Sequence, residues 1–320
     1  MLKLASNSFT TPERMSGWAA IIREYRKMGC YSPAIIESLS GRLAEMVIWE
    51  GRPCVAWEEE FAEGKPADAP DACLVREADG KYAYHDQALA FLAKVGQRHL
   101  NNFPWKSGWV RLEPFADHET ADEVTQCVGR FDRMVRDRAP GLIPRWLKIR
   151  RLFADNKRAL EKVYYALPTS VFQGDSMGSN LLLDEKGGFN GLIDYNLAGK
   201  DTVVNMFLST VLYGYSYHVK VDADPDELFG LSQNRQNAIL RNFLEALRYL
   251  GNFYTFSALE AKAAPLLYKY IVAVEYKVIQ AFEACGQDVR KQAMVLDYME
   301  HVLLQENMDF AEAMLGGGQA

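Results

Sequence analysis

The stretch FQGDSMGSN, residues 172–180, can be interpreted in two incompatible ways. Read as G-D-S-M-G, it matches the G-x-S-x-G turn that exposes a nucleophilic serine, here Ser176. Read as G-D-x-x-x-x-N, it matches a loop in which Asp175 accepts a hydroxyl proton and Asn180 binds a magnesium ion. The sequence on either side of the stretch favours one of these two chemistries.

The serine interpretation requires a helix directly after Ser176. Here Asn180-Leu-Leu-Leu runs into the turn Asp184–Gly188, a pattern typical of a strand followed by a turn. A serine triad also needs an acid and a histidine downstream, and only His218 and His301 follow. A serine hydrolase that uses Ser176 is therefore the less favoured alternative.

The magnesium interpretation gains from the sequence after Asn180. Residues 180–184 and 189–194 are typical of two short strands joined by a glycine turn, which brings Asp194 back toward Asp175 and Asn180. Two oxygen ligands beside a carboxylate base suit Mg²⁺, which binds nucleotide phosphates with few protein groups. The three side chains are predicted to converge, although Asp and Asn are also ordinary turn residues.

The segments before this hairpin predict a small mixed region and then helices. Residues 1–5 read as a strand, and Thr11 begins a helix that ends before Gly29. Residues 45–61 are predicted to form a β-hairpin, and residues 62–72, rich in Pro, Gly and Asp, a linker or hinge. Amphipathic helices dominate the rest of the chain, apart from the hairpin after Asn180.

Composition and charge limit the classes of function. The 320 residues are 49% apolar, enough for a large core, and the apolar runs are shorter than the roughly 20 residues of a bilayer span. The N-terminus lacks a secretory signal pattern, so a cytoplasmic location is expected. Five cysteines and five histidines are scattered without metal-ligand spacing. The net charge of −6 disfavours nucleic acid and permits a cationic small molecule.

Residues 173–201, QGDSMGSNLLLDEKGGFNGLIDYNLAGKD, resemble the catalytic segment of the aminoglycoside phosphotransferase and choline kinase superfamily. These proteins are small-molecule relatives of the protein kinases. Their H-G-D-x-x-x-x-N loop, hairpin and V/I-I-D-F/W segment recur here in the same order and spacing. The resemblance implies an α+β, protein-kinase-like fold with a small N-terminal nucleotide-binding lobe, residues 1–64, and a larger helical lobe with the catalytic loop and acceptor site, residues 65–320.

The resemblance also implies roles for individual residues. Asp175 would be the catalytic base, and Asn180 and Asp194 the magnesium ligands. Gln173 stands where the family has histidine and would support the loop, and Asp201 would be a structural aspartate. The implied activity is ATP- and Mg-dependent phosphoryl transfer to a hydroxyl of a small molecule of the aminoglycoside, choline, amino-alcohol or sugar type, by a monomer or homodimer.

The front of the chain departs from the family pattern. Family members place two strands and a phosphate-covering turn before the strand with the ATP-binding lysine, and that strand here begins at residue 1. Lys3 would then be the nucleotide lysine, and Glu59 and Phe61 would contact the nucleotide at the hinge. The family's helix glutamate has no counterpart at the usual spacing, since Glu13 and Glu24 lie elsewhere.

The missing front strands leave alternatives open. A truncated chain, a wrong start site and a catalytically silent kinase-like binding protein would each explain them. A sheet without two strands would also expose an edge that invites pairing with another chain. The helices of residues 205–310 are expected to carry acceptor specificity. Within them, Val211–His218 suits stacking on a cation or sugar, although tyrosines at this spacing usually pack in a core.

Overall fold

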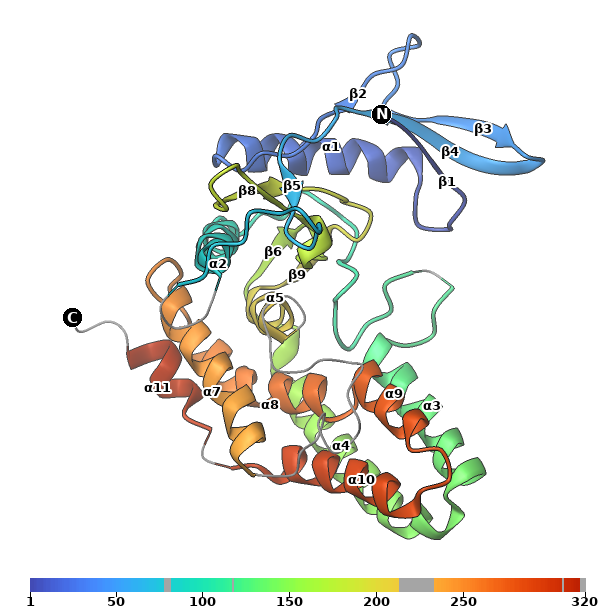
Figure 1. Cartoon of the computed structure of the whole chain (residues 1–320), viewed down its shortest axis with the longest axis vertical. Coiled ribbons are helices and arrows are strands. Elements are labelled where there is room, and N and C mark those ends of the chain that lie inside the picture. The colour runs from blue at the N-terminus through green and yellow to red at the C-terminus, as the bar shows by residue number, and fades with distance from the viewer. Residues whose placement is uncertain (78–81, 117, 213–232, 307, 317–320) are drawn as a thin grey trace. The chain divides into compact units, whose positions relative to one another are not determined.

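The computed structural model describes residues 1–77, 82–116, 118–212, 233–306 and 308–316 (Figure 1). By their internal packing, these residues divide into two compact units. The first unit comprises Met1–Val110, Phe115–His118 and Thr169–Asp201, and the second comprises Arg111–Pro114, Glu119–Pro168 and Thr202–Ala320. The segment that resembles a catalytic loop therefore packs with the N-terminal sheet. The lobe boundary predicted after residue 64 stays a prediction, because packing units and catalytic lobes are defined by different criteria.

The N-terminal sheet is built around the long strand β4 (Arg52–Glu59). Along one side β4 pairs antiparallel with β1 (Leu2–Ala5), and along the other with β3 (Glu45–Trp49) and the short β2 (Ile35–Ile36). The predicted first strand and the predicted hairpin of residues 45–61 are both present. Within a strand, alternate residues face opposite sides of the sheet.

Helix α1 (Pro12–Lys27) follows β1, as predicted. Its start is fixed by Thr11, whose side chain accepts a hydrogen bond from the Arg14 backbone N–H at 3.3 Å. Gly29, with φ of +86°, ends the helix in a conformation that favours glycine. The apolar stripe of the helix is buried: Met15, Trp18, Ile22 and Tyr25.

A second sheet contains the hairpin predicted after Asn180. Its strand order is β5 (Lys65–Pro66), β7 (Leu181–Leu183) and β8 (Phe189–Leu192), all antiparallel neighbours. The predicted hinge of residues 62–72 thus contributes a short edge strand to this hairpin. A third, two-stranded sheet joins β6 (Thr169–Phe172) to β9 (Gly199–Thr202), and α2 (Ala83–Gln97) packs on β6.

The chain after α1 is bonded to the hairpin strand β8. The Tyr31 N–H donates to the Asn190 carbonyl at 3.0 Å, and the Leu192 N–H donates to the Tyr31 carbonyl at 2.9 Å. Between these bonds, a Cβ added to Gly191 would lie 2.0 Å from the Tyr31 carbonyl oxygen. Only glycine allows this approach of two backbones, which fixes β8 against the N-terminal segment.

The second unit is helical around a core of α4, α8 and α10, which pack on one another. No helix in the described ranges is long and apolar enough to span a membrane. Residues 213–232, which hold most of the tyrosine-rich segment and His218, lie outside the described residues. The α-helices among the described residues of this unit are α3 (Glu123–Arg138), α4 (Ile143–Tyr164), α5 (Val203–Thr210), α7 (Gln233–Leu250), α8 (Ala258–Ala273), α9 (Tyr276–Ala284), α10 (Val289–Leu304) and α11 (Phe310–Leu315).

We expect Gly191→Ala to lower the free energy of unfolding by about 1–3 kcal/mol, because the added methyl group forces two hydrogen-bonded backbones apart. Gly141→Ala is the control, since a Cβ there meets nothing within 4 Å. Urea denaturation of both variants measures the difference. Equal stability of the two variants would contradict the close approach at Tyr31.

Candidate functional site

The loop after β6 turns sharply at Gly174. This residue has φ of +89°, and a Cβ on it would lie 2.1 Å from the Leu197 carbonyl oxygen. Glycine is therefore required by both the backbone conformation and the space available. The turn places Asp175 directly after the buried end of β6, and a single 3₁₀ turn, Gly178–Asn180, then leads into β7.

Asn180 and Asp175 are hydrogen bonded to each other. The buried Asn180 amide donates from Nδ2 to both the backbone carbonyl and Oδ2 of Asp175, each at 2.9 Å. Because these bonds use the nitrogen of the amide, Oδ1 is the atom that remains to bind a ligand. The predicted pairing of an aspartate and an asparagine five residues apart is thus present in the loop.

Gln173 connects this loop to the end of the hairpin. Its Nε2 donates to the carbonyl oxygens of Ile193 and Asp194, at 2.8 and 2.6 Å, and its Oε1 accepts from the Asp175 N–H at 2.8 Å. Gln173 is 1% exposed, so its partners are shielded from competing water. The Gln173 amide therefore bonds the carbonyls of two consecutive residues. The second of them, Asp194, has φ of +57°, in the left-handed region.

The surroundings of the Asp175 carboxylate disfavour its charge. Burial raises the pKa of Asp175 to about 6, and the nearby Asp194 carboxylate adds to the increase, while the hydrogen bond from Asn180 opposes it. Two like charges close together disfavour ionisation, whereas a cation between them would favour it. The three residues that the sequence singled out therefore meet in one place, and a positive ligand would be stabilised there.

A small cavity joins Asp194 to the N-terminal sheet within the first unit. Its volume is about 20 Å³, and its lining includes Asp194, Glu59 and Trp57, together with Trp18 from α1. Glu59 also forms an ion pair with Lys3, with Nζ and Oε2 2.8 Å apart. Two of the three predicted nucleotide-binding residues, Lys3 and Glu59, are thus bonded to each other, and Glu59 shares a cavity with Asp194.

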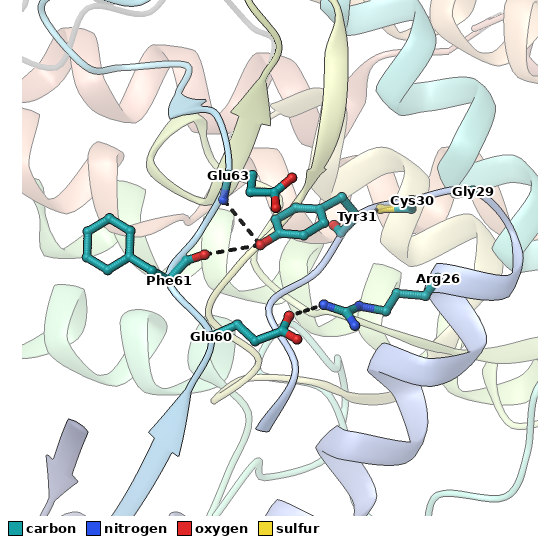
Figure 2. A pocket seen from close by; sticks show the side chains of 7 residues that line it. All are labelled: Arg26, Gly29, Cys30, Tyr31, Glu60, Phe61 and Glu63. Atoms are coloured by element: carbon teal, nitrogen blue, oxygen red, sulfur yellow. Dashed lines mark hydrogen bonds and ion pairs between the residues drawn. The ribbon is translucent and has the colours of Figure 1, made fainter. Parts of the chain in front are cut away.

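The third residue, Phe61, lines a different pocket of about 710 Å³ (Figure 2). Phe61 is 82% exposed, and its carbonyl accepts a hydrogen bond from the Tyr31 hydroxyl at 3.3 Å. The Glu63 N–H donates to the same hydroxyl at 3.2 Å, and the Arg26 guanidinium pairs with Glu60. These bonds connect the segment that follows β4 to Arg26 and Tyr31. The pocket shares no lining residue with the cavity at Asp194.

The serine alternative lacks its local structure. Ser176 is buried and is followed by a 3₁₀ turn and a strand, whereas the nucleophile turn needs an exposed serine and a helix. Asp201, also buried, accepts a hydrogen bond from the Ser107 hydroxyl at 2.6 Å. In the described ranges no three His, Cys, Asp or Glu side chains are grouped to hold a metal, and the set at Asp175 differs because it includes an amide.

Sequence reasoning missed the partner of Lys3. Neither α1 glutamate had the expected spacing, and the carboxylate comes from Glu59, 56 residues along the chain, through strand pairing. Strand register decides this contact, and no local pattern in the sequence specifies it. Trp57, whose indole N–H donates to Glu59 Oε1 at 2.6 Å, was missed for the same reason.

The fold is similar to that of a small-molecule kinase. A microcompartment-associated aminopropanol kinase has a similar structure, with a TM-score of 0.51 and 14% identity over 98% of this chain and 86% of that chain. The predicted α+β, protein-kinase-like fold class is confirmed, and so is the resemblance to the aminoglycoside phosphotransferase and choline kinase superfamily at the level of fold. At this identity the similarity shows the fold and leaves the activity to be proposed.

Two further solved structures have lower TM-scores. An amicoumacin kinase in complex with AMP-PNP and Ca²⁺ has a TM-score of 0.48 and 14% identity, over 97% of this chain and 84% of that chain. An aminoglycoside phosphotransferase from Alicyclobacillus acidocaldarius has a TM-score of 0.46 and 13% identity, over 94% and 86%. No protein-family model and no curated protein matches the chain.

The raised pKa of Asp175 predicts a pH-dependent effect of Asp175→Asn on stability without metal. The pKa of Asp175 is about 6 in the folded chain and lower in the unfolded chain. Protonated Asp175 therefore stabilises the fold at low pH, and this stabilisation is lost as the pH rises through about 6. Asn mimics the protonated form, so the melting temperature of Asp175→Asn should exceed that of the wild type more at pH 8 than at pH 5. Thermal melts in a chelator measure this gap, and a constant gap would contradict the shift.

Proposed function

We propose that this protein is an ATP- and Mg-dependent phosphotransferase that acts on a hydroxyl of a small molecule. The convergence of Asp175, Asn180 and Asp194 in one loop-and-hairpin cluster supports this proposal most directly. The kinase-like fold is consistent with it. Phosphoryl transfer relies mainly on positioning the reactants and on stabilising charge. Asp175 can position the acceptor hydroxyl, and Asn180 and Asp194 can hold a cation.

Asp175 is proposed as the base for the acceptor hydroxyl. Its pKa of about 6 leaves it mostly ionised at neutral pH, so it can accept the proton that the hydroxyl loses. The Asn180 amide holds Oδ2 of this carboxylate at 2.9 Å, which leaves Oδ1 to face the acceptor. The Gln173 bond to the Asp175 N–H fixes the backbone from which the base projects.

Asn180 and Asp194 are proposed as the magnesium ligands. Asn180 Oδ1 and the Asp194 carboxylate are hard oxygen donors. Among the described residues, the Asp194 side chain accepts a single long hydrogen bond of 3.4 Å, from the Asn196 N–H. Mg²⁺, when bound, would neutralise charge on the nucleotide phosphates. Lys3 is proposed to bind the same phosphates, and Glu59 and Phe61 to belong to the nucleotide site. The tight Gln173 contact keeps Asp194 oriented for this role.

The proposed acceptor is an aminoglycoside, choline-like, amino-alcohol or sugar compound. The similar solved structure is an aminopropanol kinase, and aminopropanol is an amino alcohol. The net charge of −6 is compatible with a cationic acceptor. A monomer or homodimer in the cytoplasm remains part of this proposal.

We expect MgATP to raise the melting temperature of the wild type by a few degrees and to leave Asp194→Asn unchanged. A ligand at 100 times its dissociation constant stabilises a protein by about 2.7 kcal/mol, and the variant lacks a charged metal ligand. Differential scanning fluorimetry with and without MgATP measures both. If the wild type does not respond, the nucleotide proposal fails.

We expect Asp175→Asn to bind MgATP and to lose about 10²–10⁴-fold in turnover, because the general base is gone. The assay follows ADP release with a panel of amino alcohols, aminoglycosides and sugars. Ser176→Ala is the control and should keep its activity. Ester hydrolysis that is lost in Ser176→Ala and kept in Asp175→Asn would support the hydrolase. MgATP binding without turnover on any acceptor would support a silent kinase-like protein.

A further inference from the structure

The register of the N-terminal sheet sets the surroundings of Lys3. Lys3 of β1 lies opposite Trp57 of β4, and Glu59 is two residues further along β4. Side chains two residues apart on a strand share a face, and directly opposite residues share it too. Lys3, Trp57 and Glu59 therefore stand on one face of the sheet, which is the face that contributes Trp57 and Glu59 to the cavity at Asp194.

Both oxygens of the Glu59 carboxylate are used on this face. Oε2 pairs with Lys3 Nζ at 2.8 Å, and Oε1 accepts from the Trp57 indole N–H at 2.6 Å. The Glu59 side chain is 16% exposed and that of Lys3 28%, so the pair is partly shielded from solvent. A carboxylate held at both oxygens has a fixed orientation, and it fixes the ammonium group in turn.

Helix α1 does not supply this carboxylate. Its glutamates are Glu13 and Glu24, and each interacts with groups other than Lys3. Hydrogen bonds at the helix start, from the backbone and from Thr11, lower the pKa of Glu13. Glu24 pairs with Lys27 at 2.8 Å. Where α1 meets the cavity, it contributes the side chains of Trp18 and Ile22.

We propose that Glu59 is the residue that positions Lys3 for the nucleotide phosphates, with Trp57 holding Glu59. This inference rests on the proposed function. In protein kinases the corresponding glutamate lies on a helix, so the position of that helix controls the ion pair. Here both partners lie on neighbouring strands of one sheet, and the pair forms independently of where α1 lies.

Glutamine cannot replace Glu59 in this arrangement. Both partners, the Lys3 ammonium and the Trp57 indole N–H, are donors, and a glutamine side chain has one acceptor oxygen. Glu59→Gln therefore keeps the size of the side chain and loses at least one of the two contacts. Glu60→Gln is a matched control, because Glu60 is the next residue and pairs with Arg26 in the other pocket (Figure 2).

The test is a double-mutant cycle on MgATP binding, measured by isothermal titration calorimetry. Glu59→Gln and Lys3→Met should each raise the dissociation constant about tenfold, since each removes the positioned charge. The double variant should bind no more weakly than Lys3→Met alone, because Glu59 acts through Lys3. Glu60→Gln should bind like the wild type. Trp57→Phe, which keeps the ring and loses the indole N–H, should give a smaller increase of the same sign.

Melts without ligand separate folding from positioning in this cycle. A variant that melts like Glu60→Gln and binds MgATP more weakly supports the positioning role. Wild-type affinity in Glu59→Gln would overturn the inference, and so would additive losses in the double variant. If Glu59→Gln fails to fold, Trp57→Phe provides the test instead. An unchanged affinity for MgATP in that variant would overturn the inference. Failure of the wild type to bind MgATP would instead overturn the proposed function.

Discussion

The hydrogen bonds of one buried glutamine hold the candidate site together. Gln173 bonds the Asp175 N–H with its oxygen and the Ile193 and Asp194 carbonyls with its nitrogen. A hydrogen bond contributes about 1 kcal/mol net, but a buried polar group left without a partner costs about 1–3 kcal/mol. Because the amide joins two segments that the chain separates by a hairpin, the geometry of both carboxylates depends on it.

The arrangement that Gln173 maintains is electrostatically unfavourable without a ligand. Asp175 and Asp194 lie close enough to raise the pKa of Asp175, and Asp194 is held with a positive φ that few residues other than glycine adopt. Both features oppose stability in the metal-free chain. Such local cost is common at functional sites, where a ligand reverses it. The buried Gln173, bonded to the backbone of both residues, keeps the two carboxylates from moving apart.

Local signals predicted much of this structure, and strand register accounts for what they missed. Helix α1 was predictable because its cap and final glycine are written in the sequence, and the hairpin after Asn180 because its turn is glycine-rich. The contact of Lys3 with Glu59 depends on the register between β1 and β4, which no short sequence pattern specifies. The approach of Tyr31 to Gly191 escaped prediction for the same reason. The convergence of Asp175, Asn180 and Asp194 was inferred from the hairpin, and the structure brings these residues together.

A glutamine at position 173 has a chemical consequence that a histidine there would not have. An imidazole titrates near pH 6.5, the same range in which Asp175 titrates with its pKa of about 6. An amide keeps its donors and acceptor at every pH, so its bonds to Asp175 and Asp194 persist while Asp175 changes charge. With a histidine at this position, the loop support and the carboxyl of residue 175 would titrate in the same pH range. Here the support is constant, and a change near pH 6 can be assigned to Asp175.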